Sequence, residues 1–342
     1  MAILYLASST LLPENTKVHN NGKPGISNMN LQIKRQPPWL QLIIFGLITI
    51  VVAVIISMVG LMIISAITHI GFLELGKLGP EDFSNPKYAG VAKGLLVVQF
   101  FGIFLAPSLL FAWLSDSRPF AFAGLKMPDH VGSIFLGILI ILFSYLMVEW
   151  TASINQDLVR SIFGKSARQW IEQGESNVNG TLQNILDMRS PKDLLVSIVL
   201  VGLLAAVGEE LFFRGILQRI MIQIFRSPWI GIVVTAAIFS AIHGQFLGFI
   251  PRMILGVILG FLYWYSGSLF PAMAGHFVFN TLQILLVYYK VIDLSPSGSH
   301  GESVLAIAGI LALAAVIALL NYMRKKSLTT YERVYHMDAE RF

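Results

Sequence analysis

The feature that most constrains this chain is a cluster of ionisable residues inside an apolar stretch. Residues 205–217 read AAVGEELFFRGIL and contain Glu209, Glu210 and Arg214. An ionisable side chain near the middle of a bilayer costs several kcal/mol, so it faces a protein interior or a water-filled cavity and is a functional candidate by default. Three such residues within six positions therefore indicate a site.

The composition predicts a membrane around this cluster. The 342 residues are 55% hydrophobic and 13% charged, with a mean hydropathy of +0.71, which is typical of a polytopic membrane protein. The net charge is +5, but Lys and Arg lie mainly between apolar runs and form no single basic patch, so no nucleic-acid partner is expected. The absence of Cys excludes disulfides, thiolate metal sites and a cysteine nucleophile.

Apolar runs of about 20 residues, long enough to cross a bilayer, recur along the chain. Seven occur near 40–67, 91–114, 131–150, 194–222, 229–249, 269–290 and 303–323. An eighth, near 252–265, is shorter and would form a short or strongly tilted span. These runs are long and continuous, unlike the weak alternation of barrel strands. We therefore expect an all-α fold, a polytopic membrane bundle of about eight transmembrane helices.

The polar stretches divide the chain into three parts. Residues 1–38 are expected to form a polar cytoplasmic tail without a cleaved signal peptide, because the apolar start lacks a basic region. Residues 39–323 form the transmembrane domain, and residues 324–342 form a cytoplasmic C-terminal tail.

Within the transmembrane domain, residues 151–193 form an extramembrane connection. Ile154, Leu158, Ile162 and Phe163 recur there at helical spacing. This pattern fits an amphipathic helix that lies on the membrane surface or packs on the end of the bundle.

Basic residues flank the apolar runs unevenly. With eight spans, four basic groups fall on one side of the membrane, at 17–35, 118–126, 219–226 and 324–333. The positive-inside rule makes this side cytoplasmic, with both termini inside. The connection at 151–193 is also basic and would lie outside. We expect a multi-pass protein of the bacterial inner (plasma) membrane, with the endoplasmic reticulum as the eukaryotic alternative.

Further polar residues recur inside the predicted spans. Three pairs are four residues apart, Glu210 with Arg214, Phe239 with His243, and His276 with Asn280. In a helix this spacing puts both members of a pair on one face. Counted from the inner ends of their spans, Glu209 and His243 lie about 20 Å deep, Asn280 about 16 Å and His276 about 10 Å. All four can therefore meet in the inner to middle part of one bundle.

Part of this pattern has a purely structural interpretation. Glu210 and Arg214 can form an internal ion pair that makes a charged helix tolerable in the membrane, and Phe239 is expected in the core. A single buried His is commonly an interhelical hydrogen-bond partner. Glu209 is harder to explain, because Arg214 neutralises only one of the two carboxylates well. Acids and imidazoles on three helices at compatible depth favour a functional site.

The groups that remain suit the hydrolysis of an amide. Glu209 and His243 can orient and deprotonate a water, while His276 and Asn280 can donate hydrogen bonds to the oxyanion that forms. No cofactor is needed in this scheme. Two His and one carboxylate also suit zinc, so Glu209, His243 and His276 are the expected ligands if a metal takes part, although H-E-x-x-H is absent. The residues alone do not separate metal-free from metal-assisted activation of water.

These residues resemble the CAAX protease and bacteriocin-processing family of intramembrane glutamic endopeptidases, which includes the prenyl-protein CAAX endopeptidase. Its motifs occur in order, E-E-x-x-x-R from Glu209, F-x-x-x-H ending at His243, and H-x-x-x-N from His276. The resemblance implies that Glu209 works with His243 on the water, without a metal, and that His276 and Asn280 stabilise the oxyanion. It implies supporting positions at Glu210, Arg214 and Phe239.

By this resemblance, residues 39–323 form an intramembrane endopeptidase that cleaves a peptide bond of a membrane-associated substrate. The expected partners are the lipid bilayer and a membrane-anchored or prenylated peptide or protein. A non-catalytic scaffold or bacteriocin-immunity-type protein with the same fold is the main alternative, but it would not need all four polar residues. A transporter with a proton relay is a third class, and the inverted repeats and paired broken helices typical of transporters are missing from the sequence.

Overall fold

The computed structural model describes residues 33–291, 302–331 and 334–335. Every regular element in these ranges is a helix, so the expected all-α class is confirmed. Most of the predicted N-terminal tail, residues 1–32, lies outside the described residues, as do parts of the C-terminal tail.

In the part of the chain that the structure describes, seven helical segments are long and apolar enough to cross a membrane, as in an integral multi-pass membrane protein. They are Pro38–Thr68 (α1), Pro86–Ser115 (with α3, Ala89–Gln99, and α4, Ala106–Ser115), Gly132–Ile162 (α6), Pro191–Phe225, Phe249–Ser266 (α12), Phe270–Tyr288 (α13) and Ser303–Lys326, within α14 (Glu302–Lys326). The eighth apolar helix is α11, Pro228–Ile242, with 15 residues.

The short helix is not the one that the sequence predicts. The run at 252–265 is extended at its start and becomes the 18-residue helix α12. The run at 229–249 instead leaves the helical path at its end, because Gly244 adopts a positive φ of 66° directly after His243. Glycine reaches this backbone region without steric cost, so α11 stops and a loop, residues 243–248, connects it to α12.

The connection after the third span also differs from the single amphipathic helix that the pattern predicts. Helix α6 continues to Ile162, 12 residues beyond the apolar run that ends at 150, and it exposes Ile154 and Leu158. The chain then turns at Phe163 and Gly164 into a separate helix, α7, at Lys165–Ile185. The sequence pattern did not separate these two helices, because the apolar residues at helical spacing continue into the turn at Phe163.

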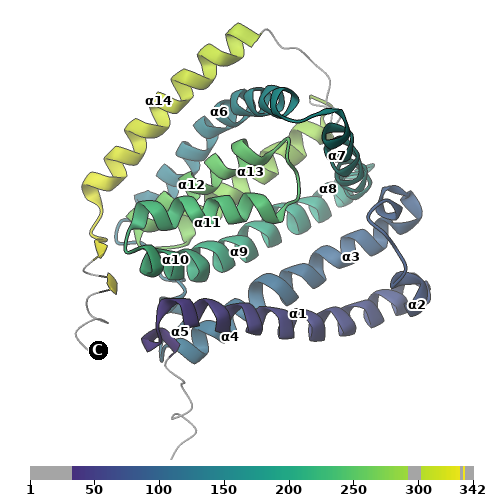
Figure 1. Ribbon diagram of the computed structural model, residues 1–342, viewed down its shortest axis with the longest axis horizontal. Coiled ribbons are helices and arrows are strands. Elements are labelled where there is room, and N and C mark those ends of the chain that lie inside the picture. Colours follow the sequence, from purple (N-terminus) through teal and green to yellow (C-terminus); the bar gives the residue numbers. More distant parts are fainter. Residues whose placement is uncertain (1–32, 292–301, 332–333, 336–342) are drawn as a thin grey trace, which may run out of the picture.

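The segment Pro191–Phe225 is the element around which the bundle is built. It runs through α8 (Pro191–Ser197), α9 (Ala205–Glu209) and α10 (Gln218–Phe225), with π-helical turns at 198–204 and 210–217 between them. Figure 1 shows α8, α9 and α10 following one line across the bundle, with α1 along one side and α11, α12 and α13 along the other. Helix α14 packs on α6 at the outer edge (Figure 1). π-helical turns often occur at functional sites.

Helices α10 and α11 approach each other closely at a glycine. A Cβ atom built on Gly231 would lie 2.7 Å from the backbone N and Cα of Ile222. Backbone atoms cannot rotate away as a side chain can, so only glycine fits this contact.

We expect Gly231→Ala to destabilise the protein by about 1–3 kcal/mol, as overpacking of a tight contact does. Thermal unfolding of the purified protein in detergent measures the loss as a lower midpoint. Gly46→Ala on α1 is the matched control, because a Cβ there meets nothing within 4 Å. Equal midpoints for the two variants would contradict the close contact.

A surface ion pair joins the segment before α1 to the end of α4. Lys34 Nζ donates to Asp116 Oδ2 at 2.6 Å. Partial burial opposes ionisation of Asp116, but hydrogen bonds from Lys34 and from the Arg118 amide outweigh it and hold the pKa of Asp116 below its ordinary value. The carboxylate therefore contributes stability above the pKa of about 3.9 that it has in the unfolded chain, and this is lost as the pH falls through the lower folded value.

We expect Asp116→Asn to lower the thermal midpoint at pH 6 and to lower it less at pH 3, because protonation of Asp116 removes part of its contribution. Unfolding followed at several pH values gives the difference between the variant and the unchanged protein. A difference that persists undiminished at pH 3 would show that the charge of Asp116 is not its source.

Candidate active site

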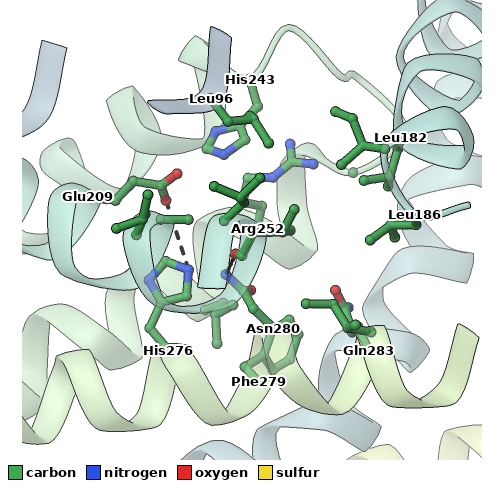
Figure 2. A pocket seen from close by; sticks show the side chains of 18 of the residues that line it. Leu96, Leu182, Leu186, Glu209, His243, Arg252, His276, Phe279, Asn280 and Gln283 are labelled. Carbon is green, nitrogen blue, oxygen red and sulfur yellow. Dashed lines mark hydrogen bonds and ion pairs between the residues drawn. The ribbon is translucent and has the colours of Figure 1, made fainter. Parts of the chain in front are cut away.

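The four residues predicted to carry the chemistry lie around one cavity. Glu209, His243, His276 and Asn280 all line a space of about 460 Å³ (Figure 2). Glu209 is the last residue of α9, His243 follows α11, and His276 and Asn280 lie on one face of α13. Three helices distant in sequence therefore bring these side chains together.

A hydrogen-bonded charge network is joined to this cavity through His276. Glu210 Oε1 accepts a hydrogen bond from Arg214 Nη1 at 2.8 Å, the ion pair that the spacing predicts, and lies 2.8 Å from His276 Nδ1. Arg214 Nη2 donates to the carbonyl of Gly256 on α12 at 3.1 Å. The side chains of Glu210 and Arg214 are 0% and 1% exposed. A buried charge needs such partners, and the network ties the π-helical turn at 210–217 to α12 and α13.

Phe239 is a buried core residue whose ring contacts Arg214, His243 and His276. The Arg214 guanidinium carbon lies 4.6 Å from the centroid of its ring, and the ring contacts both imidazoles edge-on, with centroids 4.9 Å from His243 and 6.3 Å from His276. A cation over an aromatic face is stabilised by the ring quadrupole. Phe239 thus supports the positions of Arg214 and of both imidazoles.

Both imidazoles turn the same nitrogen towards the cavity. His243 Nδ1 lies 2.8 Å from the Phe239 carbonyl, which can only accept a hydrogen bond, so Nδ1 carries a proton. The same holds for His276 Nδ1 beside the Glu210 carboxylate, which also accepts from Arg214. Each Nε2 is left for other partners. His276 Nε2 lies 3.9 Å from Glu209 Oε2.

Asn280 keeps one amide hydrogen for a ligand. Its Nδ2 donates to the Val201 carbonyl at 3.1 Å, in the π-helical turn before α9. The amide group has two donor hydrogens, so the second remains. The bond also fixes the orientation of the amide, because the nitrogen must face Val201.

Two further charged residues near the cavity were not predicted from the sequence. Arg252, in the first turn of α12, lines the cavity. Glu175 on α7 is buried and holds the loop at 243–248, accepting from the Leu247 amide at 2.9 Å and from Gln245 Nε2 at 3.2 Å. In the sequence, Arg252 stands at the start of the apolar run at 252–265. A basic residue in this position equally fits a membrane boundary, so it did not indicate a site.

The site was also compared with the requirements of a metal ion. Among residues 33–291, 302–331 and 334–335, no group of three or more His, Asp or Glu side chains is arranged to hold one. Glu209, His243 and His276, the ligands expected for a metal-assisted reaction, therefore share the cavity without forming a ligand set. The metal-free scheme stays a prediction.

The region that carries these residues matches a known family. Residues 191–282 match the family described as type II CAAX prenyl endopeptidase Rce1-like. The resemblance to CAAX proteases is confirmed. The match begins at the start of α8 and ends within α13, so it covers all three motifs.

Two curated relatives are similar to parts of the chain. YpbD, an uncharacterised protein of Bacillus subtilis strain 168, is 27% identical over 139 residues, which are 40% of this chain and 67% of that protein. An uncharacterised 24.3 kDa protein of Escherichia coli is 30% identical over 105 residues, which are 28% of this chain and 46% of that protein. No solved structure matches the chain.

The buried network predicts an asymmetric response to mutation. Arg214→Met should cost about 3 kcal/mol or more, because it leaves Glu210 as a buried charge without its guanidinium. The double variant Glu210→Gln, Arg214→Met should recover part of that loss, since both charges are then gone. Thermal unfolding in detergent measures both. A double variant no more stable than Arg214→Met would contradict the pairing.

Proposed function

We propose that this chain is an intramembrane endopeptidase that hydrolyses a peptide bond of a membrane-associated substrate with a water activated by Glu209 and His243. The match to the CAAX prenyl endopeptidase family supports protease activity in general. The observation that carries the finer proposal is the convergence of Glu209, His243, His276 and Asn280 on one cavity among the membrane-spanning helices.

The proposed reaction begins with the removal of a proton from water. Glu209 and the unprotonated Nε2 of His243 accept hydrogen bonds from the water and take its proton as its oxygen attacks the scissile carbonyl carbon. A tetrahedral intermediate forms, with negative charge on the former carbonyl oxygen. The same proton then passes to the amide nitrogen of the substrate and the C–N bond breaks, which gives a carboxylic acid and an amine. The acid transfers its proton to the amine, so a carboxylate and an ammonium group leave.

The proposed oxyanion donors are His276 and Asn280. Asn280 offers the amide hydrogen that Val201 does not use. To donate from Nε2, His276 must carry a proton there as well as on Nδ1. The Glu210 carboxylate on one side of the ring and the Glu209 carboxylate on the other would stabilise the resulting positive charge. Donors held in position for a developing oxyanion contribute about 3–4 kcal/mol each to catalysis.

The walls of the cavity indicate an apolar, membrane-associated peptide as substrate. Most lining residues are hydrophobic and come from α3, α7, α12, α13 and the segment before Glu209; examples are Leu96, Leu182, Leu186, Leu200 and Leu255. A membrane-anchored or prenylated peptide has the apolar surface that these walls would bury. We propose that it is cleaved in the plasma membrane of a bacterium, with both termini of the enzyme cytoplasmic.

We expect Glu209→Gln to lower kcat by about 10²- to 10⁴-fold, the range for loss of a general base. Purified protein in detergent is incubated with membrane-anchored and prenylated peptides, and products are identified by mass spectrometry. Glu149→Gln is the matched control, because this acid lies on α6 and does not line the cavity.

Three outcomes would change the proposal. Equal cleavage by Glu209→Gln and by the unchanged protein would exclude Glu209 as the base. Activity lost with a chelator and restored by zinc would replace metal-free activation with a metal-assisted reaction. Peptide binding without cleavage by the unchanged protein would favour a scaffold.

A further inference from the structure

One cation in the cavity wall has no part in the proposed chemistry. Arg252 lines the same cavity as Glu209, His243 and Asn280, and Figure 2 shows it among these side chains. Among the described residues its one hydrogen bond runs from Nη2 to Gln245 Oε1, at 2.7 Å. Nη1 is buried and has no hydrogen-bond partner in the same part of the chain.

No carboxylate forms an ion pair with Arg252 among the residues that the structure describes. Glu175 and Glu209 are within electrostatic range of the guanidinium, but both oxygens of Glu175 are used by the loop at 243–248. Gln245 links Glu175 to Arg252, because its amide nitrogen donates a hydrogen bond to Glu175 and its amide oxygen accepts one from Arg252. This arrangement holds the guanidinium in place without supplying a direct counter-charge.

Partial burial of the Arg252 guanidinium costs free energy that its hydrogen bond to Gln245 does not offset. Moving a charged group out of water costs several kcal/mol unless a counter-charge and hydrogen bonds compensate it. Arginine donates from a planar fork that matches a carboxylate, often with two parallel hydrogen bonds. A substrate carboxylate would supply the missing partner.

We propose that Arg252 is a specificity-determining residue that binds a carboxylate group of the substrate. The proposal rests on the peptidase function proposed above, and it narrows the substrate to peptides with a negative charge near the scissile bond. Gln245 and Glu175 are positioning residues, which act on the substrate only through Arg252.

Arg252 lines the same cavity as His276 and Asn280, so a carboxylate bound to its guanidinium lies near the scissile bond. This carboxylate is either the C-terminus of a peptide or the side chain of an Asp or Glu.

Peptide binding to the Glu209→Gln protein tests this proposal without any cleavage. The probes are fluorescein-labelled peptides of six apolar residues, made as the free acid, as the C-terminal amide, and as the amide with one Asp or one Asn at each position. Fluorescence anisotropy in a non-ionic detergent gives the Kd. We expect one carboxylate-bearing form to bind about tenfold or more tightly than its neutral counterpart, as a charge-assisted hydrogen bond provides.

Substitutions of Arg252 should remove this preference selectively. Adding Arg252→Gln should make the acid and neutral forms bind equally, at the level of the neutral form, and Arg252→Lys should restore part of the difference. Arg168→Gln on α7 removes the same charge away from the cavity and should leave the preference intact. The thermal midpoint of Arg252→Gln should equal or exceed that of its parent, because an uncompensated charge is removed.

The preferred form also identifies the source of the carboxylate. Preference for the free acid over the amide assigns it to the peptide C-terminus, and preference for Asp over Asn at one position assigns it to a side chain. Equal binding of all forms, no binding of any form, or a preference that survives Arg252→Gln would each overturn the proposal. Because Glu209→Gln replaces the proposed base, these results are independent of whether the unchanged protein cleaves peptides.

Discussion

One carboxylate oxygen, Oε1 of Glu210, holds the site together. It accepts a hydrogen bond from Arg214, one helical turn along its own segment, and another from His276 on α13. Arg214 in turn reaches the Gly256 carbonyl on α12. Buried charges need charged or hydrogen-bonding partners, so the pairing of Glu210 with Arg214 and His276 links the segments that carry these residues. It also fixes the orientation of the His276 ring, because Nδ1 must face Glu210 and Nε2 must face the cavity.

This network leaves Glu209 as the acidic side chain beside the cavity that has no strong partner of its own. Glu209 Oε2 lies 3.9 Å from His276 Nε2, which is longer than a hydrogen bond. A carboxylate so placed can accept a hydrogen bond from a water or a substrate. Adjacent acids in one helix thus have different partners because their side chains leave the helix in different directions.

The local parts of the site could be predicted from the sequence, and the contacts between helices could not. Residues four apart share a helix face, so the pairing of Glu210 with Arg214 and the common face of His276 and Asn280 follow from spacing alone. The bond from His276 to Glu210 joins residues 66 apart, and no local rule predicts it. The ends of two helices differ from the ends of the predicted apolar runs. Gly244 shortens α11, whereas α6 runs past the end of its apolar stretch because nothing in the next 12 residues breaks a helix. Arg252 was missed since an arginine at the head of an apolar run also fits a topology signal.

Some residues of the cavity wall lie inside the family match at residues 191–282, and others lie outside it. Glu209, His243, His276 and Asn280 all come from that stretch, whereas Leu96 and Gln99 come from α3 and Leu182 and Leu186 from α7 and its end. The proposed reacting groups and part of the cavity wall are therefore encoded in different parts of the chain. If the proposed function holds, changes in α3 or α7 alter which peptides are accepted while the proposed reacting groups stay in place, so one such centre can serve new substrates when the helices around it change.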